Sequence, residues 1–353
     1  MYNFQKRIHY RGDLKPFLKQ VCQDFHIGEY GSCKIVPIGY EDFNLFLKTK
    51  RGRYFVKIFA SFRNKNECSR YVEIMDSVLK AGISYPRLYK SNQDHLYEIS
   101  NNSQTDRLCV MEFIDGQNFY QLQTTPTVKE MRFIIKQAAL VNKIDIRPSL
   151  VYDQWAITNF PKEYKKKGQY LNKEDKNLIE PLVDVFNSLS VENLPHCFVH
   201  GDITKTNTMK SVNGDIYILD FAVANYYPRI QELAVILCDL FFNPKGFGSF
   251  PKNYDLALSE YQKYITLTAD EIKKLPDYVK LAHAMHVLLA SYEKVVNGNT
   301  SAENEYFLGM GRIGLRYTNK LNVLALSDAI IFEWKPEKHQ PPRLNNNSEI
   351  VTL

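Results

Sequence analysis

A pair of segments in the middle of the chain limits the possible folds more than any other feature of the sequence. Residues 200–207 read His-Gly-Asp-Ile-Thr-Lys-Thr-Asn, residues 218–221 read Ile-Leu-Asp-Phe, and Asn213-Gly214 lies between them. Asn-Gly between strand-forming residues is the strongest short-range signal of a β-hairpin. A two-residue turn at this position predicts that Asn207 and Asp220 face each other directly across two short strands.

Three side chains of these segments suit phosphoryl transfer. Asp202 precedes the predicted hairpin, where its carboxylate can accept the proton of a substrate hydroxyl group. The amide oxygen of Asn207 and the carboxylate of Asp220 are hard ligands, which together can hold one Mg²⁺ ion. A His-Gly-Asp turn alone is more often a local cap. The combination with Asn207 and Asp220 predicts Asp202 as the catalytic base and the other two residues as metal ligands.

The spacing of apolar residues changes near residue 115 of 353, from a strand-like to a helix-like pattern. Before it, residues 33–59 alternate apolar and polar side chains as in three antiparallel strands, whereas helical periodicity dominates after residue 128. A chain of this length commonly forms two domains or lobes. We expect an α+β fold with a small antiparallel-sheet lobe containing one helix (1–115), a larger, mostly helical lobe (116–334) and a flexible tail (335–353).

Composition and charge exclude several classes of protein. The 45 basic and 39 acidic residues give a net charge of +6 without a marked basic cluster, so no nucleic-acid partner is expected. The longest apolar stretch, 233–242, is too short to cross a membrane and contains Asp239. Six cysteines without a C-x-x-C pair are typical of reduced thiols. We expect a cytoplasmic monomer or homodimer that acts on a small molecule.

The spacing His200-Gly-Asp-x-x-x-x-Asn207, followed by Asp220-Phe221, resembles the signature of the aminoglycoside phosphotransferase, choline kinase and homoserine kinase superfamily. Residues 228–234 are similar to the segment that follows the signature in that superfamily, with Glu232 where Asp is commoner. The resemblance implies a bilobal protein-kinase-like fold that uses ATP and Mg²⁺. It also implies transfer of the γ-phosphate to a hydroxyl group of an amino alcohol, a hydroxy amino acid or an aminoglycoside.

Lys57 stands in the alternating segment 53–59, at the position that resembles the nucleotide-binding lysine of the superfamily. A single lysine in a strand is more often a residue at the sheet edge whose charged end reaches solvent. A lysine that binds phosphates is oriented by a carboxylate from a helix. Glu67 is preferred for this role because it shares the apolar helix face of Tyr71, and Glu73 remains the alternative.

The resemblance extends to the predicted nucleotide site of the first lobe. Gly39 and Asn44 match the loop that folds over the phosphates in that superfamily. The segment around Met111 resembles the linker between the lobes. The resemblance therefore implies that the backbone near Glu112 and Ile114 forms hydrogen bonds to adenine, and that Met111 lines the adenine pocket.

Two other functions are compatible with these motifs. The first is a catalytically silent binding module with a kinase fold, which the complete set of motif residues disfavours. The second is a protein kinase, which is disfavoured because no Ala-Pro-Glu-like activation segment follows Asp220-Phe221.

Two further patterns in the last third of the chain receive structural interpretations. Residues 309–314 match the G-x-G-x-x-G pattern, but they follow a helical stretch, so they are interpreted as a close contact between helices and not as a dinucleotide site. His283 and His286 have no third metal ligand nearby in the sequence. They are therefore interpreted as packing residues or as part of a substrate wall.

Overall fold

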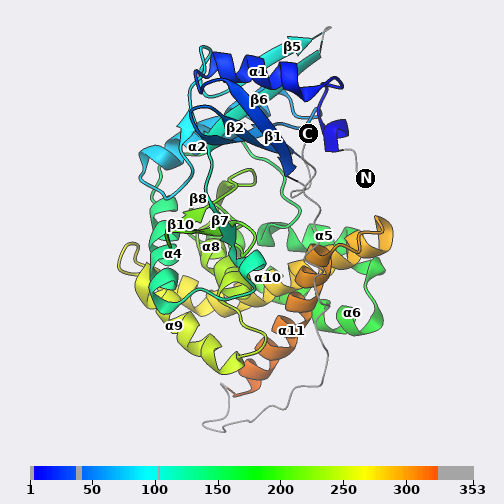
Figure 1. Ribbon diagram of the computed structural model, residues 1–353. Coiled ribbons are helices and arrows are strands. Elements are labelled where there is room, and N and C mark those ends of the chain that lie inside the picture. The colour runs from blue at the N-terminus through cyan, green and yellow to red at the C-terminus, as the bar shows by residue number, and fades with distance from the viewer. Residues whose placement is uncertain (1–3, 37–41, 102–103, 325–353) are drawn as a thin grey trace. The chain divides into compact units, whose positions relative to one another are not determined.

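The computed structural model describes residues 4–36, 42–101 and 104–324. These residues form two compact units, and Figure 1 labels many of their elements. The first unit contains the described residues up to Gly116 together with Lys210–Ala222, and the second contains Gln117–Met209 and the described residues from Val223 onward. The predicted tail at 335–353 lies outside the described residues.

One segment departs from the predicted division near residue 115. Residues 210–222 group with the first unit because their backbone is hydrogen bonded to it. The amide of Ile218 donates to the carbonyl of Ser84 at 2.9 Å, and the amide of Val212 donates to the carbonyl of Asp115 at 2.8 Å. The segment that carries Asp220 is therefore part of the first unit.

An antiparallel sheet forms the framework of the first unit. Its strand order is β1-β2-β3-β6-β4, and β5 pairs with the other part of β6. The strands are β1 (Tyr30–Val36), β2 (Phe43–Thr49), β3 (Arg53–Ile58), β4 (Leu88–Tyr89), β5 (Tyr97–Asn101) and β6 (Gln104–Glu112). Leu45, Leu47 and Val56 point into a core that also receives side chains from helix α1 (Leu14–Asp24). The predicted strands at 33–59 are confirmed.

The two longer helices of the first unit begin at capping residues that the sequence supplies. Asp13 accepts a hydrogen bond from the amide of Lys15 and starts α1. Asn64 and Glu67 form a reciprocal capping box at the start of α2 (Lys65–Lys80), in which each side chain accepts from the other residue's amide. The helix ends just before Gly82, whose φ of +75° is easily reached only by glycine.

The central hairpin has a longer turn than predicted, so the predicted pairing of Asn207 with Asp220 is wrong. The amide of Ser211 donates to the carbonyl of Asp215 at 2.8 Å, which leaves three residues in the loop. A two-residue Asn-Gly turn needs positive φ at both residues, but of these two only Gly214 has one (+89°). The register between strands β9 (Thr208–Ser211) and β10 (Ile216–Ile218) is shifted by one residue, and β10 ends before Asp220.

The second unit is mostly helical and includes the antiparallel pair of β8 (His196–Val199) and β11 (Asn225–Pro228). Its helices are α3 (Phe119–Leu122), α4 (Val128–Val141), α5 (Phe160–Lys167), α6 (Lys173–Ile179), α7 (Leu182–Ser188), α8 (Ile230–Val235), α9 (Phe250–Tyr261), α10 (Ala269–Val296) and α11 (Ala302–Leu324). A π-helical segment, Ile236–Leu240, continues α8. The predicted α+β composition, with a strand-rich first part and a helical second part, is confirmed.

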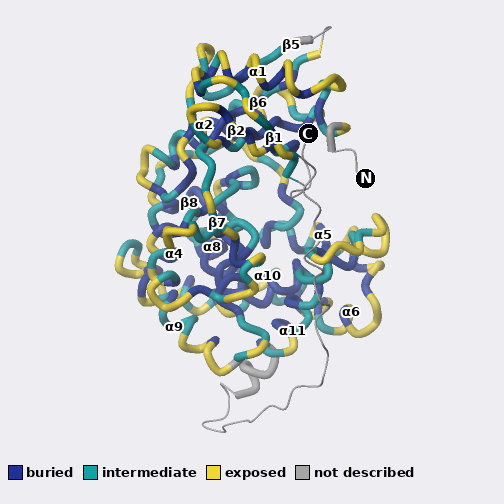
Figure 2. Tube along the Cα trace, viewed as in Figure 1, coloured by how far each residue is buried: buried dark blue, intermediate teal, exposed yellow. Residues whose placement is uncertain are grey.

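Helix α10 is buried along its middle turns, as Figure 2 shows, and α11 packs against it through glycines. A Cβ atom on Gly311 would lie 2.7 Å from Val287 Cγ2, and a Cβ atom on Gly314 would overlap the imidazole ring of His283. The predicted close helix contact at 309–314 is therefore confirmed for these two glycines. Among the described helices, none is both long and apolar enough to span a membrane.

The two kinds of glycine in α11 allow a matched test. We expect Gly314→Ala to lower the free energy of unfolding by about 1–3 kcal/mol, because the added methyl group overpacks the contact with His283. Gly309→Ala should be neutral or stabilising by up to about 1 kcal/mol, since nothing lies within 4 Å of its Cβ position and alanine favours helix. Urea unfolding of both variants measures the difference. Equal effects of the two substitutions would refute the close contact.

Candidate active site

Lys57 lies at the centre of a buried polar cluster in the first unit. Its side chain points inward from β3 and is only 8% exposed. Its ammonium lies 3.1 Å from Asp42 Oδ2, 3.7 Å from Asp220 Oδ1 and 3.1 Å from Tyr71 Oη. Burial alone lowers the pKa of Lys57, but the carboxylates of Asp220 and Asp42 outweigh it and raise the pKa above its ordinary value. Lys57 is therefore a permanent buried cation.

Asp42 is fixed in place from several directions. Its Oδ1 accepts hydrogen bonds from the amide of Ala60 at 3.0 Å and from Arg63 Nε at 3.2 Å, while Oδ2 faces Lys57. The carboxylate is almost fully buried. Because its oxygens are held by a backbone amide and two cations, Asp42 can orient the lysine without moving itself.

Tyr71 of α2 links the lysine to Asp220. Its hydroxyl accepts from Lys57 and donates to Asp220 Oδ1 at 2.8 Å. Burial and the neighbouring carboxylate of Asp220 raise the pKa of Tyr71 well above its ordinary value, so the phenol stays a donor. The Asp220 backbone has a φ of +63°, a left-handed conformation that aspartate tolerates better than most residues. Its Oδ1 also accepts from the amide of Ala222 at 3.2 Å.

The predicted orientation of Lys57 by Glu67 is not found. Glu67 is exposed, and its carboxylate accepts from the amide of Asn64 at 2.9 Å in the capping box of its own helix. The alternative, Glu73, is also exposed. A carboxylate at the first turn of a helix is attracted to the free amides there, which explains why Glu67 turns back. Asp42 and Tyr71 occupy the positions around the lysine instead.

The other predicted nucleotide residues lie in or next to the strands of the sheet, except one that is outside the described part. Asn44 lies in β2, directly opposite Lys57, and not in a loop. Met111 is buried in β6, where its sulfur lies 3.6 Å from the Tyr85 hydroxyl. Glu112 ends β6, and no hydrogen bond within the described residues engages the amide of Ile114. Gly39 lies outside the described residues.

The second unit holds the His-Gly-Asp turn and Asn207. The Asn207 side chain donates from Nδ2 to Asp202 Oδ2 at 2.6 Å and to the Asp202 carbonyl at 3.2 Å. The amide of Asp202 in turn donates to His200 Nδ1 at 3.1 Å. Both side-chain hydrogen bonds of Asn207 use its Nδ2. Its Oδ1 accepts no hydrogen bond within the described residues. The structure thus brings Asp202 and Asn207 together.

A buried glutamate in α8 fixes this turn. Glu232 is fully buried and accepts from the amide of His200 at 2.7 Å and from the amide of Gly201 at 3.3 Å. Burial raises the pKa of Glu232 to about 7, although these amides and Asn142 oppose the shift. Gly201 has a φ of +78°, so glycine is the residue that permits this turn without strain. The glutamate replaces the commoner aspartate and still reaches the backbone.

Asn142, at the end of α4, connects the turn to the rest of the unit. Its Nδ2 donates to the carbonyl of Phe198 at 2.9 Å and to Glu232 Oε2 at 3.4 Å. Its Oδ1 accepts from the hydroxyl of Tyr261 at 2.7 Å. Through these three bonds Asn142 ties the end of α4 to the strand before the turn, to Glu232 and to Tyr261.

A second buried carboxylate, Asp239 in the π-helical segment, supports the other end of the turn. Its Oδ1 accepts from the amide of Lys205 at 2.6 Å, and its Oδ2 accepts from the hydroxyl of Tyr306 at 2.9 Å. The Lys205 ammonium donates to the carbonyl of Phe242 at 3.1 Å. The backbone between His200 and Lys205 is therefore held at both ends by carboxylates from the following helix.

Sequence reasoning missed the roles of Asp42, Tyr71, Glu232 and Asp239, but the first two left a signal. Asp42 lies two residues before Asn44, which pairs with Lys57, so Asp42 falls on the same face of the sheet as the lysine. Tyr71 lies one helical turn after Glu67 on the face that packs on the sheet. Glu232 and Asp239 reach backbone amides, and sequence spacing carries little information about such contacts.

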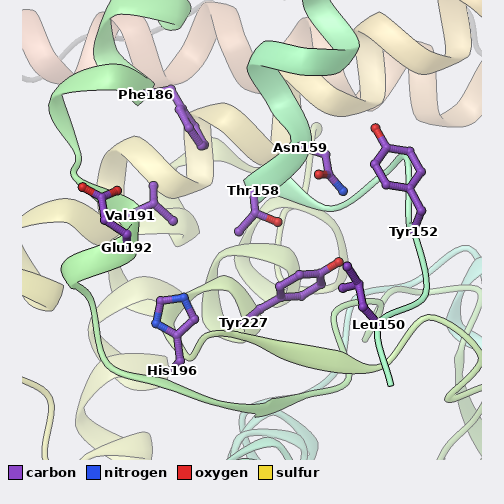
Figure 3. A pocket seen from close by; sticks show the side chains of 9 residues that line it. All are labelled: Leu150, Tyr152, Thr158, Asn159, Phe186, Val191, Glu192, His196 and Tyr227. Carbon is purple, nitrogen blue, oxygen red and sulfur yellow. The ribbon is translucent and has the colours of Figure 1, made fainter. Parts of the chain in front are cut away.

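A cavity of about 430 Å³ lies in the second unit. Figure 3 shows its lining side chains: Leu150, Tyr152, Thr158, Asn159, Phe186, Val191, Glu192, His196 and Tyr227. The hydroxyl of Tyr152 is already hydrogen bonded to Glu163, and the ammonium of Lys162 lies 4.1 Å from its ring centre. None of the predicted site residues lines this cavity.

Comparison with known proteins supports the interpretation of these motifs. The model of a family described as "Phosphotransferase enzyme family" matches residues 32–264. This range contains both the Lys57 cluster and the turn with Asp202 and Asn207.

Solved structures with the same fold are small-molecule kinases. An amicoumacin kinase bound to AMP-PNP and Ca²⁺ has 15% sequence identity and a TM-score of 0.64, over 91% of this chain and 96% of that one. A spectinomycin phosphotransferase bound to ADP and spectinomycin has 13% identity and a TM-score of 0.63, over 87% and 99%. The choline kinase of Streptococcus pneumoniae has 13% identity and a TM-score of 0.58, over 86% and 99%. The predicted protein-kinase-like fold is confirmed.

The buried ion pair of Lys57 with Asp42 predicts a difference between two acidic residues. Asp42→Asn should lower the free energy of unfolding by about 3 kcal/mol, because it removes a charge that compensates a buried cation. Glu67→Gln should cost less than about 1 kcal/mol, since Glu67 is exposed and only caps its helix. Thermal and urea unfolding measure both. A larger cost for Glu67→Gln would contradict the contacts described for Lys57.

The raised pKa of Glu232 predicts a pH dependence. Folded Glu232 binds its proton more tightly than the unfolded residue, since its pKa rises from 4.5 to about 7. The stabilising contribution of protonated Glu232 is therefore fully present below the unfolded pKa of 4.5, and it is lost as the pH rises through the folded pKa of about 7. The free energy of unfolding of the wild type minus that of Glu232→Gln should fall between these two pH values and then level off. A difference that is constant with pH would contradict the assignment.

Proposed function

The chain belongs to the phosphotransferase enzyme family, as its motifs predicted, and we propose that it transfers the γ-phosphate of ATP to a hydroxyl group of a small molecule, with Mg²⁺ as cofactor. One observation carries this proposal. The carboxylate of Asp202 is held by Asn207 in a turn whose backbone is fixed by the buried Glu232. Such rigid support is what a catalytic carboxylate needs in order to meet a hydroxyl group in the correct geometry.

Asp202 is the proposed catalytic base. It is only partly buried, so a substrate can reach its carboxylate. The bond from Asn207 Nδ2 to Oδ2 fixes the carboxylate plane. The proposed role is to orient the acceptor hydroxyl group and to accept its proton as the bond to phosphorus forms.

Asn207 and Asp220 are the proposed metal ligands, and their donor atoms fit Mg²⁺. Asn207 presents an amide oxygen, because its nitrogen is used by Asp202. Asp220 presents a carboxylate that is 44% exposed, so it is accessible to a hydrated ion. Both are the oxygen ligands that Mg²⁺ prefers. When bound, the ion would neutralise charge on the transferred phosphoryl group.

Lys57 is the proposed phosphate-binding cation. Asp42 replaces Glu67 as the residue that keeps it oriented, and Tyr71 fixes the distance to Asp220. The backbone near Glu112 and Ile114 is proposed to contact adenine, in keeping with an Ile114 amide that has no hydrogen bond within the described residues. Met111 would line the adenine pocket.

The acceptor is proposed to be an amino alcohol, a hydroxy amino acid or an aminoglycoside-type compound. The structural relatives are named for such acceptors, among them amicoumacin, spectinomycin and choline. A coupled assay of ADP release with choline, ethanolamine, homoserine, sugars and aminoglycosides tests the proposal. ADP release that depends on both Mg²⁺ and one acceptor class supports it, and no acceptor-stimulated ADP release across the panel would count against it.

Asp202→Asn should lower the turnover number by roughly 10²- to 10⁴-fold, because the proton of the acceptor hydroxyl group loses its base. The affinity for nucleotide should be largely unchanged, since Asp202 is not proposed to contact ATP. Steady-state kinetics and nucleotide titration measure the two effects.

Asp215→Asn is the matched control, because Asp215 is an exposed aspartate next to the loop of the hairpin that follows Asp202. This variant should retain wild-type turnover. Full turnover by Asp202→Asn would remove its assignment as the base.

Asp220→Asn should instead weaken the Mg²⁺ dependence of nucleotide binding. Asparagine tolerates the left-handed backbone at this position.

A further inference from the structure

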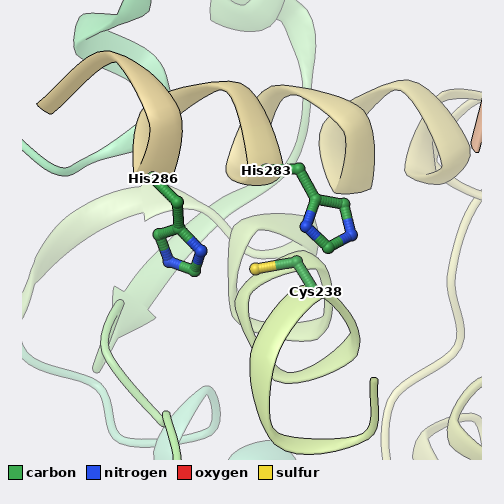
Figure 4. Close-up of side chains that lie close together, drawn as sticks. All are labelled: Cys238, His283 and His286. Carbon is green, nitrogen blue, oxygen red and sulfur yellow. The ribbon is translucent and has the colours of Figure 1, made fainter. Parts of the chain in front are cut away.

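Two histidines of α10 and one cysteine of the π-helical segment form a buried cluster in the second unit. One potential ligand atom from each of Cys238, His283 and His286 lies within 4.8 Å of the other two. Figure 4 shows both imidazole rings on the side of α10 that faces the segment with Cys238. The sequence did not reveal this third residue, because it comes from a different helix.

The histidines lack the hydrogen bonds that buried imidazoles normally form. Neither ring nitrogen of His283, nor Nδ1 of His286, has a hydrogen-bond partner among the described residues. His283 is fully buried and His286 is nearly so. Each buried polar group without a partner costs about 1–3 kcal/mol, so packing alone is a poor explanation for two adjacent histidines.

An aromatic ring packs against each of the two histidines. The ring of Phe242 lies 5.0 Å from that of His283, and the ring of Phe307 lies 5.1 Å from that of His286, measured between centroids. The absence of a side chain on Gly314 provides the space that the His283 ring occupies. This glycine therefore accommodates a buried imidazole.

We propose that Cys238, His283 and His286 bind one Zn²⁺ ion. One thiolate and two imidazoles are borderline and soft ligands, which favour zinc over Mg²⁺ or Ca²⁺. Asp239 is not counted as a ligand because its oxygens accept from the amide of Lys205 and the hydroxyl of Tyr306. Three protein ligands leave the fourth tetrahedral position to water.

The geometry needs only small side-chain movements. Zinc bonds of about 2.0–2.3 Å at tetrahedral angles place ligand atoms roughly 3.5 Å apart. The ligand atoms here lie within 4.8 Å of one another, so rotation about the side-chain bonds by a modest amount closes the set. The i and i+3 spacing of the histidines keeps both rings on one face of the helix.

The two imidazoles are neutral, whereas the Cys238 thiol must lose its proton to bind a metal ion. Burial and the proximity of His286 lower the pKa of His283 to about 3, so its ring is neutral. Burial raises the pKa of the Cys238 thiol well above its ordinary value, and a bound cation reverses this effect. On binding, the sulfur–hydrogen bond breaks, its proton leaves to solvent and a sulfur–zinc bond forms. Each imidazole contributes one nitrogen lone pair and keeps its proton on the other nitrogen.

Zinc at this place would join α10 to the segment that supports the catalytic turn. Cys238 precedes Asp239, whose carboxylate holds the amide of Lys205. We therefore expect the ion to stabilise the fold around this segment.

Titration of metal-stripped, reduced wild-type protein with Co²⁺ tests the proposal. We expect one equivalent to give the intense visible bands of tetrahedral cobalt and a thiolate-to-cobalt absorption band in the near ultraviolet. Cobalt at the proposed magnesium site would have only oxygen ligands and no thiolate band. Zn²⁺ should displace the cobalt and raise the melting temperature.

Variants identify the ligands. Cys238→Ser should abolish the thiolate band, and His286→Gln should weaken cobalt binding by about 10- to 100-fold or more. Cys22→Ala is the control, because Cys22 is equally buried but lies in α1. A thiolate band that persists in Cys238→Ser, or no thiolate band in the wild type, would overturn the proposal.

X-ray absorption of the zinc-loaded wild type covers the case in which a variant fails to fold. One sulfur and two imidazoles around zinc support the site, since within the described residues only this cluster brings a cysteine together with two histidines. A shell of oxygen atoms alone would refute it.

Discussion

The buried positive charge of Lys57 determines the arrangement of the first unit. An ammonium removed from water is tolerated only if anionic and polar groups surround it. Here Asp42 approaches from the start of β2, Tyr71 from α2 and Asp220 from the segment after β10. These elements are distant in sequence, and the attraction of their polar groups to the Lys57 ammonium stabilises their meeting at one point. The same charge is suited to phosphate groups, so a requirement of folding and a proposed requirement of function coincide at this residue.

The second unit uses anions in the opposite way. Glu232 and Asp239 are fully buried, and both accept hydrogen bonds from backbone amides of the turn. These contacts to backbone amides fix the path of the chain. Because a buried carboxylate needs hydrogen-bond donors, it binds these backbone amides and makes the loop rigid. In this way a short stretch of α8 and the π-helical segment prescribes the position of the Asp202 side chain.

Local patterns were sufficient to predict the elements of the fold, whereas contacts between elements were harder to predict. Alternation of apolar and polar residues predicted the strands at 33–59, because this signal acts over a few residues. The choice of Glu67 failed since a carboxylate near a helix start can serve its own helix, and periodicity cannot distinguish the two uses. The hairpin register failed because Asn213-Gly214 permits loops of two or three residues, which only backbone angles distinguish. Cys238 lies close to two histidines of another helix, and this proximity cannot be predicted from the spacing of the residues in the sequence.

The contact between Gly314 and His283 has an evolutionary consequence. The His283 ring fills the volume that a side chain at position 314 would occupy, so neither position can vary independently of the other. A lineage that replaces the histidine with a small residue would tolerate a side chain at position 314, whereas a lineage that keeps the imidazole would retain the glycine. These two positions should therefore show correlated substitution across relatives, and Cys238 should vary with them if all three residues serve a common purpose.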